Sequence, residues 1–417
     1  MISEITFNGY RFFADGSSLS FVADRRVKSL LSNSFSLDKR QILKSLALYG
    51  GNNTGKTNIV ALMVAIKRVL QGQDRIKFNS DVFNDRRGVS ISITYNNQDD
   101  LKWLRYEFEY DCVKREFLKE RIEAITYYES GNPNIKTVLE LDRDAKILNV
   151  FGINKTELLD VIVGQKPFVY SVKVDEGSFA NLGPYKGSFV KLAESIEIVD
   201  LYNVPIDKTI EALKGGDEKK KAFIASFVKH ADLSIDSFEL RTNDPFTVLD
   251  TGIKEKALEE YNKVADALRL TTTYGKARVP SILYDSAGTK KIEAIASYIY
   301  DSLTKGTLLV VDEIDNGLHF ALTRAILSLF NNIANTKGQL ICTAHDLLLV
   351  DCKHLMRKEQ IYFLSRHKDG ARLFRLSEQP VAESGLREGG DLLKHYYRGE
   401  FGHVPSPSFV KELLSLR

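Results

Sequence analysis

The chain has 417 residues, of which 43% are hydrophobic and 27% are charged, a composition typical of folded globular proteins and unlike that of disordered or fibrous chains. Its 58 basic and 55 acidic side chains leave a formal net charge of +3, so the total charge gives no argument for nucleic-acid binding. A chain of this length exceeds what one hydrophobic core usually serves, so we expect two domains or one domain with large insertions.

Cysteine usage and hydropathy restrict the cellular setting. Cys112, Cys342 and Cys352 are far apart and form no CxxC pair, which argues against a disulfide framework and against a zinc site. No segment approaches the roughly 18 consecutive apolar residues of a membrane span. The opening MISEITFNGY lacks the basic and apolar regions of a signal peptide. We therefore expect a cytoplasmic protein with no membrane partner.

The first third of the chain predicts a β-rich lobe with one glycine-rich loop. Two apolar segments, Ile5–Tyr10 and Leu19–Val22, flank a turn-rich stretch and predict a hairpin. Ile42–Tyr49 is a compact apolar run followed by glycines and then by helical spacing up to Gly72, the order strand, loop, helix. From Val89 to about Leu141, period-two alternation predicts an antiparallel meander.

The rest of the chain predicts helices and then a return to an α/β pattern. Helical spacing covers 206–213, 219–230 and 254–268, with no heptad run long enough for a coiled coil. After Ser281 the pattern gives a helix at 290–303, a buried strand at 308–311, a helix at 318–335, and strands at 339–344 and 360–365. We expect an N-terminal lobe at 1–145, a mainly helical insertion at 146–275 and a C-terminal lobe at 276–417.

One glycine loop matches the phosphate-binding pattern GxxxxGK[ST]. In this pattern backbone N–H groups surround the phosphates, a lysine neutralises them and a hydroxyl reaches Mg²⁺. A chance match is the alternative, and the strand before the loop and the helix after it argue against it. ATP is favoured over GTP because Asn154–Glu157 lacks the aspartate of NKxD. The loop residues are Gly50, Gly51, Asn52, Asn53, Thr54, Gly55, Lys56 and Thr57, and Asn58 follows.

Three further segments carry candidate chemistry. The apolar strand after Thr307 ends in Asp312 and Glu313, where Asp312 could hold Mg²⁺ and Glu313 could activate water; alone, this is also an ordinary strand end. His345 ends another strand at the edge where α/β sheets bind ligands, although a lone histidine is more often structural. Ser286 and Gly288 begin a helix with an anion-binding start, and alone read as an ordinary N-cap.

Taken together, GGNNTGKTN, DSAGTKK, LLVVDEIDNGLH and CTAHD resemble the motifs of ABC-type ATPase heads of the SMC and RecF kind. Within them, the chain is most similar to the predicted ATPases of bacterial abortive-infection and restriction-linked operons. The opening ITFNGYRFFADGSSLSF and the segments RKEQIYFLSR and YYRGEFGHVP resemble the first hairpin and the tail of that group. The resemblance covers roughly residues 1–110 and 275–405.

The resemblance assigns roles to single residues. Ser286 and Gly288 match the signature loop, which contacts the γ-phosphate held by a second subunit, so two sites would form only on dimerisation. Asp315 matches a residue of the loop after the acidic strand, and His345 matches the switch histidine. Arg11 matches a basic residue near the phosphates. The signature segment of this chain, DSAGT, departs from the LSGGQ sequence of that class. Gln71 and Gln73 lie at the end of the helix after the P-loop, and neither makes a convincing Q-loop glutamine.

The sequence thus favours an ATPase that dimerises around ATP and Mg²⁺ and regulates a separate effector, a nuclease or toxin from the same operon, in anti-phage defence. Related nucleases carry a further module after the switch histidine, and the short segment after His345 has no DxD motif for one. The alternative is a RecF-like DNA repair ATPase, with basic clusters at Arg25–Arg26, Arg86–Arg87 and Lys219–Lys221 as its DNA contact. A third reading is a sensor that holds ATP without hydrolysing it, and a transporter subunit fits less well.

Overall fold

A computed structural model describes residues 1–74, 76–80, 86–97, 102–128, 132–174, 177–201, 204–232, 234–241, 255–350, 354–367 and 370–378. Within these ranges the strands form sheets of eight, six, three and two strands. The two largest sheets hold most of the core, and helix α1 (Lys56–Leu70) lies between them. The expected α/β fold with an antiparallel β subdomain is confirmed.

The six-stranded sheet is the centre of the molecule. Its first five strands run parallel, and only the last strand is antiparallel to its neighbour. Parallel strands direct their carboxyl ends to the same edge of a sheet, where ligands bind in α/β folds. In spatial order the strands are β12 (Ile196–Asp200), β16 (Leu308–Asp312), β17 (Gln339–Ala344), β5 (Ser45–Gly50), β18 (Ile361–His367) and β19 (Gly370–Arg375).

The eight-stranded sheet joins the expected hairpin to the expected meander. All of its pairings are antiparallel, and β1 pairs with β6, so the two predicted parts form one sheet. In chain order its strands are β1 (Ile2–Asn8), β2 (Ser17–Ser20), β6 (Gly88–Asn97), β7 (Lys102–Asp111), β8 (Glu116–Thr126), β9 (Asn134–Asp142), β10 (Ile147–Val150) and β11 (Ile153–Asn154).

Both faces of the central sheet are covered. Successive side chains of a strand point to opposite faces, so Leu46 and Leu48 join the core around α1, whereas Ala47 and Tyr49 join a second core. That second core contains the inner faces of α8 (Ala287–Lys305) and α9 (Phe320–Phe330). Burial on both faces explains why these strands read as continuous apolar runs in the sequence.

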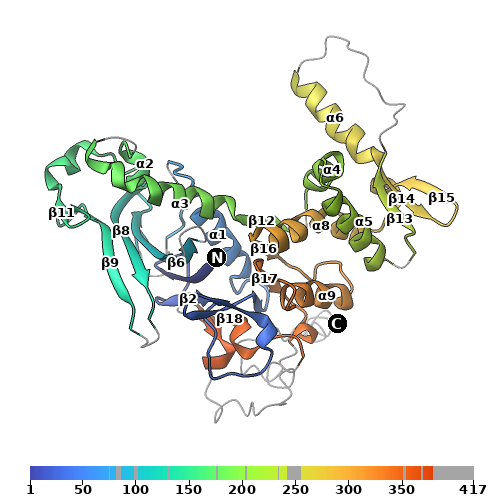
Figure 1. The fold of residues 1–417 in the computed structure, drawn as a ribbon, viewed down its shortest axis with the longest axis horizontal. Coiled ribbons are helices and arrows are strands. Elements are labelled where there is room, and N and C mark those ends of the chain that lie inside the picture. The colour runs from blue at the N-terminus through green and yellow to red at the C-terminus, as the bar shows by residue number, and fades with distance from the viewer. Residues whose placement is uncertain are drawn as a thin grey trace, which may run out of the picture.

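The remaining helices lie at the two ends of the molecule. Figure 1 shows α2 and α3 beside the strands of the eight-stranded sheet, and α4, α5 and α6 grouped with β13–β15 at the other end. The bounds are α2 (Phe168–Ser171), α3 (Gly183–Glu194), α4 (Asp207–Lys214), α5 (Glu218–Ala231), α6 (Glu255–Arg269), α7 (Ser281–Tyr284), β13 (Ser237–Leu240), β14 (Leu270–Tyr274), β15 (Ala277–Pro280), β3 (Ser34–Leu37) and β4 (Arg40–Leu43). Short 3₁₀ helices are η1 (Leu31–Asn33), η2 (Thr156–Val161), η3 (Gly177–Leu182), η4 (Leu347–Leu349), η5 (Lys358–Gln360) and η6 (Leu376–Glu378).

The segment expected to be a mainly helical insertion also contains strands, among them β13 and β14 of the three-stranded sheet. The three predicted helices are present as α4, α5 and α6, but the same segment also contains β12, an edge strand of the central sheet. β12 pairs in parallel with β16, placing Asp200 opposite Asp312. The chain therefore returns to the core in the middle of the segment, and β10 and β11 likewise extend the N-terminal sheet beyond residue 145.

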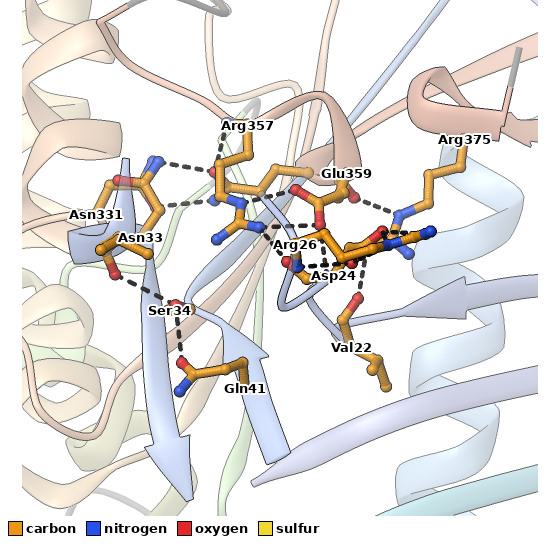
Figure 2. A network of polar contacts seen from close by, with 12 residues as sticks. Val22, Asp24, Arg26, Asn33, Ser34, Gln41, Asn331, Arg357, Glu359 and Arg375 are labelled. Atoms are coloured by element: carbon orange, nitrogen blue, oxygen red, sulfur yellow. Dashed lines mark hydrogen bonds and ion pairs between the residues drawn. The ribbon is translucent and has the colours of Figure 1, made fainter. Parts of the chain in front are cut away.

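A polar network fastens the N-terminal segment to the C-terminal part of the central sheet (Figure 2). The Arg357 guanidinium donates to both oxygens of Glu359, at 2.7 and 3.0 Å, and also to the backbone oxygen of Asp24. Glu359 accepts from the backbone N–H of Asp24, and Arg375 donates to the backbone oxygens of Val22 and Glu359. The buried ion pair Arg357–Glu359 thus binds the backbone of Asp24, which is more than 330 residues away in sequence.

No helix in the part of the chain that the structure describes is long and apolar enough to cross a membrane. The expected tail motif YYRGEFGHVP and Cys352 lie outside the described residues.

Candidate functional site

The glycine loop connects the carboxyl end of β5 to the start of α1, the strand–loop–helix order that the pattern requires. Two of its glycines cannot be replaced without a steric conflict. A Cβ on Gly50 would lie 2.6 Å from the Leu364 oxygen, and a Cβ on Gly55 would lie 2.8 Å from the Phe13 ring. Gly55 also has a φ of +112°, which side-chain-bearing residues rarely adopt. Packing of the loop against β18 and the N-terminal segment therefore requires glycine at both positions.

Lys56 is buried inside this loop. The residue is only 6% exposed. Its Nζ donates to the backbone oxygens of Gly50 and Gly51 at 2.6 and 3.0 Å. Burial lowers the pKa of the ammonium to about 8, although the nearby charges of Glu313 and Asp312 raise it. The Lys56 ammonium thus lies close to the acidic residues of β16.

Arg11 reaches the first turn of α1. Its guanidinium donates to the side-chain oxygen of Asn58 and lies over the Tyr10 ring, 5.6 Å from the centroid. Its backbone has a φ of +53°, and among the described residues its buried Nε has no hydrogen-bond partner. A strained backbone and an unsatisfied buried donor beside the P-loop are typical of a residue that serves a ligand rather than the fold.

The acidic pair at the end of β16 is held by Thr343 of the neighbouring strand β17. The Thr343 hydroxyl donates to Asp312 Oδ1 at 2.5 Å and accepts from the Glu313 backbone N–H at 2.7 Å. Glu313 has a φ of +51°, a conformation that is costly for a residue other than glycine. One buried threonine therefore holds the Asp312 carboxylate and the backbone of Glu313, and no local sequence pattern identified it.

His345 lies one residue beyond β17, beside this pair. Its Nε2 is 4.0 Å from Glu313 Oε1, and both side chains are roughly 40% exposed. Asp315 accepts from the backbone N–H groups of His345 and Asp346, at 2.7 and 2.6 Å, and so fixes the loop that carries the imidazole. Burial, followed by the charge of Lys56, lowers the pKa of His345, so the imidazole is neutral at pH 7.

Ser286 caps α8, and Gly288 packs against the loop after β16. The Ser286 hydroxyl accepts from the backbone N–H of Thr289 at 3.1 Å, as an N-cap does. A Cβ on Gly288 would lie 2.8 Å from the Gly317 oxygen. In the hydrogen bonds found for the described part of the chain, these two residues contact their own surroundings and not the P-loop of the same chain.

Asn316 and Lys291, to which the sequence analysis gave no role, connect helix α8 to Glu313. Asn316 donates to Glu313 Oε2 at 2.8 Å, and Lys291 donates to the backbone and side-chain oxygens of Asn316, both at 2.9 Å. Asn316 belongs to the loop between β16 and α9, and Lys291 to α8. Their types gave no signal, because asparagine and lysine are common on exposed loops and helices.

The residues present fit a nucleotide with its metal. The loop joins a strand to a helix N-terminus, where backbone N–H groups favour an anion, and the buried ammonium of Lys56 lies in it. Thr57, exposed in the first turn of α1, and Asp312 are the hydroxyl and carboxylate ligands that Mg²⁺ takes in such sites. Gln71 and Gln73 lie at the far end of α1, a helix of 15 residues and therefore about 22 Å long, so neither reaches this site.

The basic clusters that would support DNA binding are largely engaged in ion pairs. In the described part of the chain, four of their seven basic residues form ion pairs. Lys220 is nearly buried with Asp301, and Arg26, Arg86 and Lys221 form exposed or partly exposed pairs. Arginines and lysines held in this way offer fewer free charges to phosphates. The pairs are Arg26–Asp24, Arg86–Asp15, Lys220–Asp301 and Lys221–Glu218.

Comparison with known proteins gives one family model and a set of distant structures. The model described as "AAA domain, putative AbiEii toxin, Type IV TA system" matches residues 200–351, less than half of the chain. The match contains β16, β17 and the start of α8, but not the P-loop. No curated protein matches the sequence.

The similar solved structures include SMC heads and the recombination mediator RecF. An SMC head bound to the C-terminal winged-helix domain of ScpA has 14% identity and a TM-score of 0.45, and the alignment covers 89% of this chain and 97% of that one. The SMC head domain from Thermotoga maritima has 13% identity and a TM-score of 0.41, with 90% and 98% covered. The recombination mediator RecF has 14% identity and a TM-score of 0.34, also with 90% and 98% covered. The strand order of the central sheet, the P-loop between β5 and α1 and the acidic end of β16 give this chain the α/β architecture of a P-loop nucleotide-binding fold.

Proposed function

We propose that this chain binds ATP at the β5–α1 loop and hydrolyses it to ADP and phosphate. The observation that carries the proposal is the meeting of three groups at one edge of the central sheet. β16, β17 and β5 are neighbours. Glu313 and His345 directly follow β16 and β17, and Lys56 begins α1 after the loop that follows β5. A buried cation, a carboxylate and a neutral imidazole at one phosphate-binding edge are the groups that phosphoryl transfer needs.

Each residue has a distinct role in this reaction. Glu313 accepts a proton from the attacking water as its oxygen bonds to the γ-phosphorus and the bond to the ADP oxygen breaks. The neutral His345, 4.0 Å from Glu313, orients that water or hydrogen-bonds the γ-phosphate. Lys56 and Arg11 balance the negative charge of the phosphates. Bound Mg²⁺, held by Thr57 and Asp312, would neutralise the phosphate oxygens further.

We also propose that two copies close around ATP, so that Ser286 and Gly288 of each copy complete the site of the other. The N-terminus of α8 offers backbone N–H groups and a hydroxyl, a favourable environment for an anion. Within one chain these residues do not contact the P-loop, and a second copy would supply them. Symmetric pairing through one shared surface is the commonest form of assembly.

The variant Glu313→Gln tests hydrolysis and pairing together. If Glu313 is the general base, the variant binds ATP but turns it over at least about 100-fold more slowly, since a positioned base contributes 10²–10⁴-fold. Light scattering after gel filtration should then show an ATP-dependent dimer that the parent protein forms only transiently. The matched control is Glu313→Gln combined with Lys56→Ala, which should stay monomeric. Unchanged turnover by the single variant would instead support a sensor that holds ATP without using it.

We further propose that this ATPase controls a separate effector in the bacterial cytoplasm, a nuclease or toxin from the same operon, in anti-phage defence. The family model that matches residues 200–351 takes its name from a toxin–antitoxin system, which supports this setting. Purification of the tagged chain from cells that express the whole operon should recover a second protein in an ATP-dependent manner. Full protection against phage by this chain alone would contradict the proposal.

A further inference from the structure

We propose that Lys291 and Asn316 are positioning residues. They connect the signature segment, which is the start of α8 with Ser286 and Gly288, to the general base Glu313. Through them, contact of Ser286 and Gly288 with the partner copy's ATP would control water activation at this copy's own site. The inference rests on the proposed ATP-dependent pairing. It adds a regulatory link between the two sites of a dimer.

The hydrogen bonds of Asn316 give the first support. Its side-chain nitrogen donates to Glu313 Oε2 at 2.8 Å, and its side-chain oxygen accepts from Lys291 Nζ at 2.9 Å. A carboxylate can only accept and an ammonium can only donate, so the orientation of the amide between them is fixed by chemistry. Each end of the asparagine therefore contacts a different functional segment, α8 on one side and the base on the other.

The geometry of Glu313 gives the second support. The residue follows β16 with a φ of +51°, and Thr343 holds its backbone N–H. The backbone is thus fixed, and the bond from Asn316 restricts the side chain by holding Oε2. Oε1 remains on the side of His345, 4.0 Å from its Nε2. Loss of the Asn316 bond would release the carboxylate while leaving its backbone in place.

Close packing between α8 and the catalytic loop gives the third support. A Cβ on Gly288 would lie 2.8 Å from the Gly317 oxygen, and a Cβ on Gly317 would lie 3.1 Å from Lys291 Nζ. Gly288 therefore brings the first turn of α8 directly against the backbone of the loop after β16. Tightly packed segments shift together and do not deform smoothly. A displacement of the signature segment therefore moves the loop that holds Glu313.

The connection has a kinetic consequence in a dimer. In the proposed dimer, the signature segment of each copy contacts the ATP held by the partner copy. Glu313 of the same copy acts on the ATP held by its own P-loop. A link between them couples the two sites, and coupled sites give cooperative dependence on ATP. A lysine and an asparagine that only stabilised the fold would not produce this cooperativity.

The experiment compares Lys291→Met and Asn316→Ala with the parent chain in steady-state ATP hydrolysis. Lys290→Met is the matched control, because it removes the neighbouring lysine of α8 and leaves the Asn316 contacts intact. Lys291→Arg keeps donors at the same place and should restore part of the rate. We expect kcat to fall about 10-fold or more in the first two variants, with the ATP concentration for half-maximal rate changed less than about 3-fold, because base positioning acts in the transition state.

Two further readouts separate positioning from general support of the fold. The Hill coefficient of the parent should exceed 1 and fall to about 1 in both variants, since the link between sites is cut. The double variant should be no slower than the slower single variant, because both changes break the same link. ATP-dependent dimerisation and the melting temperature should remain those of the parent.

The outcomes distinguish this inference from the function on which it rests. If the parent hydrolyses ATP and both variants keep its kcat and Hill coefficient, the link is absent and the proposed ATPase stands. If the variants lose ATP binding or melt early together with the rate, Lys291 and Asn316 only support the fold and the inference is wrong. A parent chain without ATP turnover overturns both.

Discussion

Thr343 is the residue on which the geometry of both acidic groups depends. It is fully buried, and its single hydroxyl bonds Asp312 Oδ1 and the Glu313 backbone N–H. Thr343→Val keeps the shape of the side chain and removes both bonds. Groups that orient a metal ligand or base contribute about 10–100-fold to activity, so kcat should fall by that factor and half-maximal rate should need more Mg²⁺.

The control for this prediction is Thr343→Ser, which retains the hydroxyl and should keep most of the rate. Initial-rate measurements over a Mg²⁺ series, with melting curves for each variant, provide the test. If valine and serine variants behaved alike, the hydroxyl would have no part in the site.

At this scale the sequence identifies residues whose motif is local and misses those whose partners are distant. Gly50–Thr57, Asp312 and Glu313 could be named from short runs of sequence. Thr343 and Asn316 could not, because their roles depend on β17 lying beside β16 and on the course of the loop to α9. Both are polar residues of common type, and only tertiary structure places them against a carboxylate.

Helix α8 carries a buried carboxyl that should make stability depend on pH. Glu293 is 1% exposed, and Ser281 donates to its Oε2. Burial, followed by the hydrogen bond and charge of Asp285, raises the pKa of Glu293 to about 9. An unfolded glutamate has a pKa of about 4.3. Between these values the folded chain holds a proton that the unfolded chain has lost, so stability falls as pH rises through that window.

Glu293→Gln should remove this pH dependence, because an amide does not ionise. At pH 9 the variant should melt higher than the parent by roughly 2 °C or more, the shift that about 1 kcal/mol produces in a large domain. Near pH 5 the two should differ little. Melting curves from pH 5 to 9 provide the measurement, with Glu211→Gln on the exposed face of α4 as the control. Parallel curves for Glu293→Gln and the parent would contradict the pKa assignment.

Elements were predictable where their pattern was long or their burial complete. The meander strands alternate over many residues, and β5, β16 and β17 are mostly apolar and buried throughout. β12 was missed because IEIVD is a five-residue edge strand whose partner β16 lies about a hundred residues later. Short edge strands depend on their neighbour more than on their own sequence.

The whole molecule is proposed to act as a pair, and mixing two inactive variants tests this. Lys56→Ala disables the P-loop, and Ser286→Arg disables the signature segment. If sites are shared, each variant alone should be nearly inactive. A 1:1 mixture should recover up to about a quarter of the parent rate, because half of the dimers are mixed and each mixed dimer has one intact site. ATP turnover after co-refolding or co-expression measures the recovery. No recovery in mixed dimers would indicate sites built within one chain.

The order of strands in the central sheet also governs when the site can first exist during synthesis. β5 carries the P-loop, but its two neighbours, β17 and β18, are translated almost 300 residues later. Pairings this distant in sequence form slowly and leave apolar strand edges exposed in the meantime. A nascent or truncated chain that ends before residue 339 therefore has the complete phosphate-binding motif and no sheet to support it. Such a fragment would be a substrate for chaperones and proteases, and nucleotide binding would report that translation has reached the last strands.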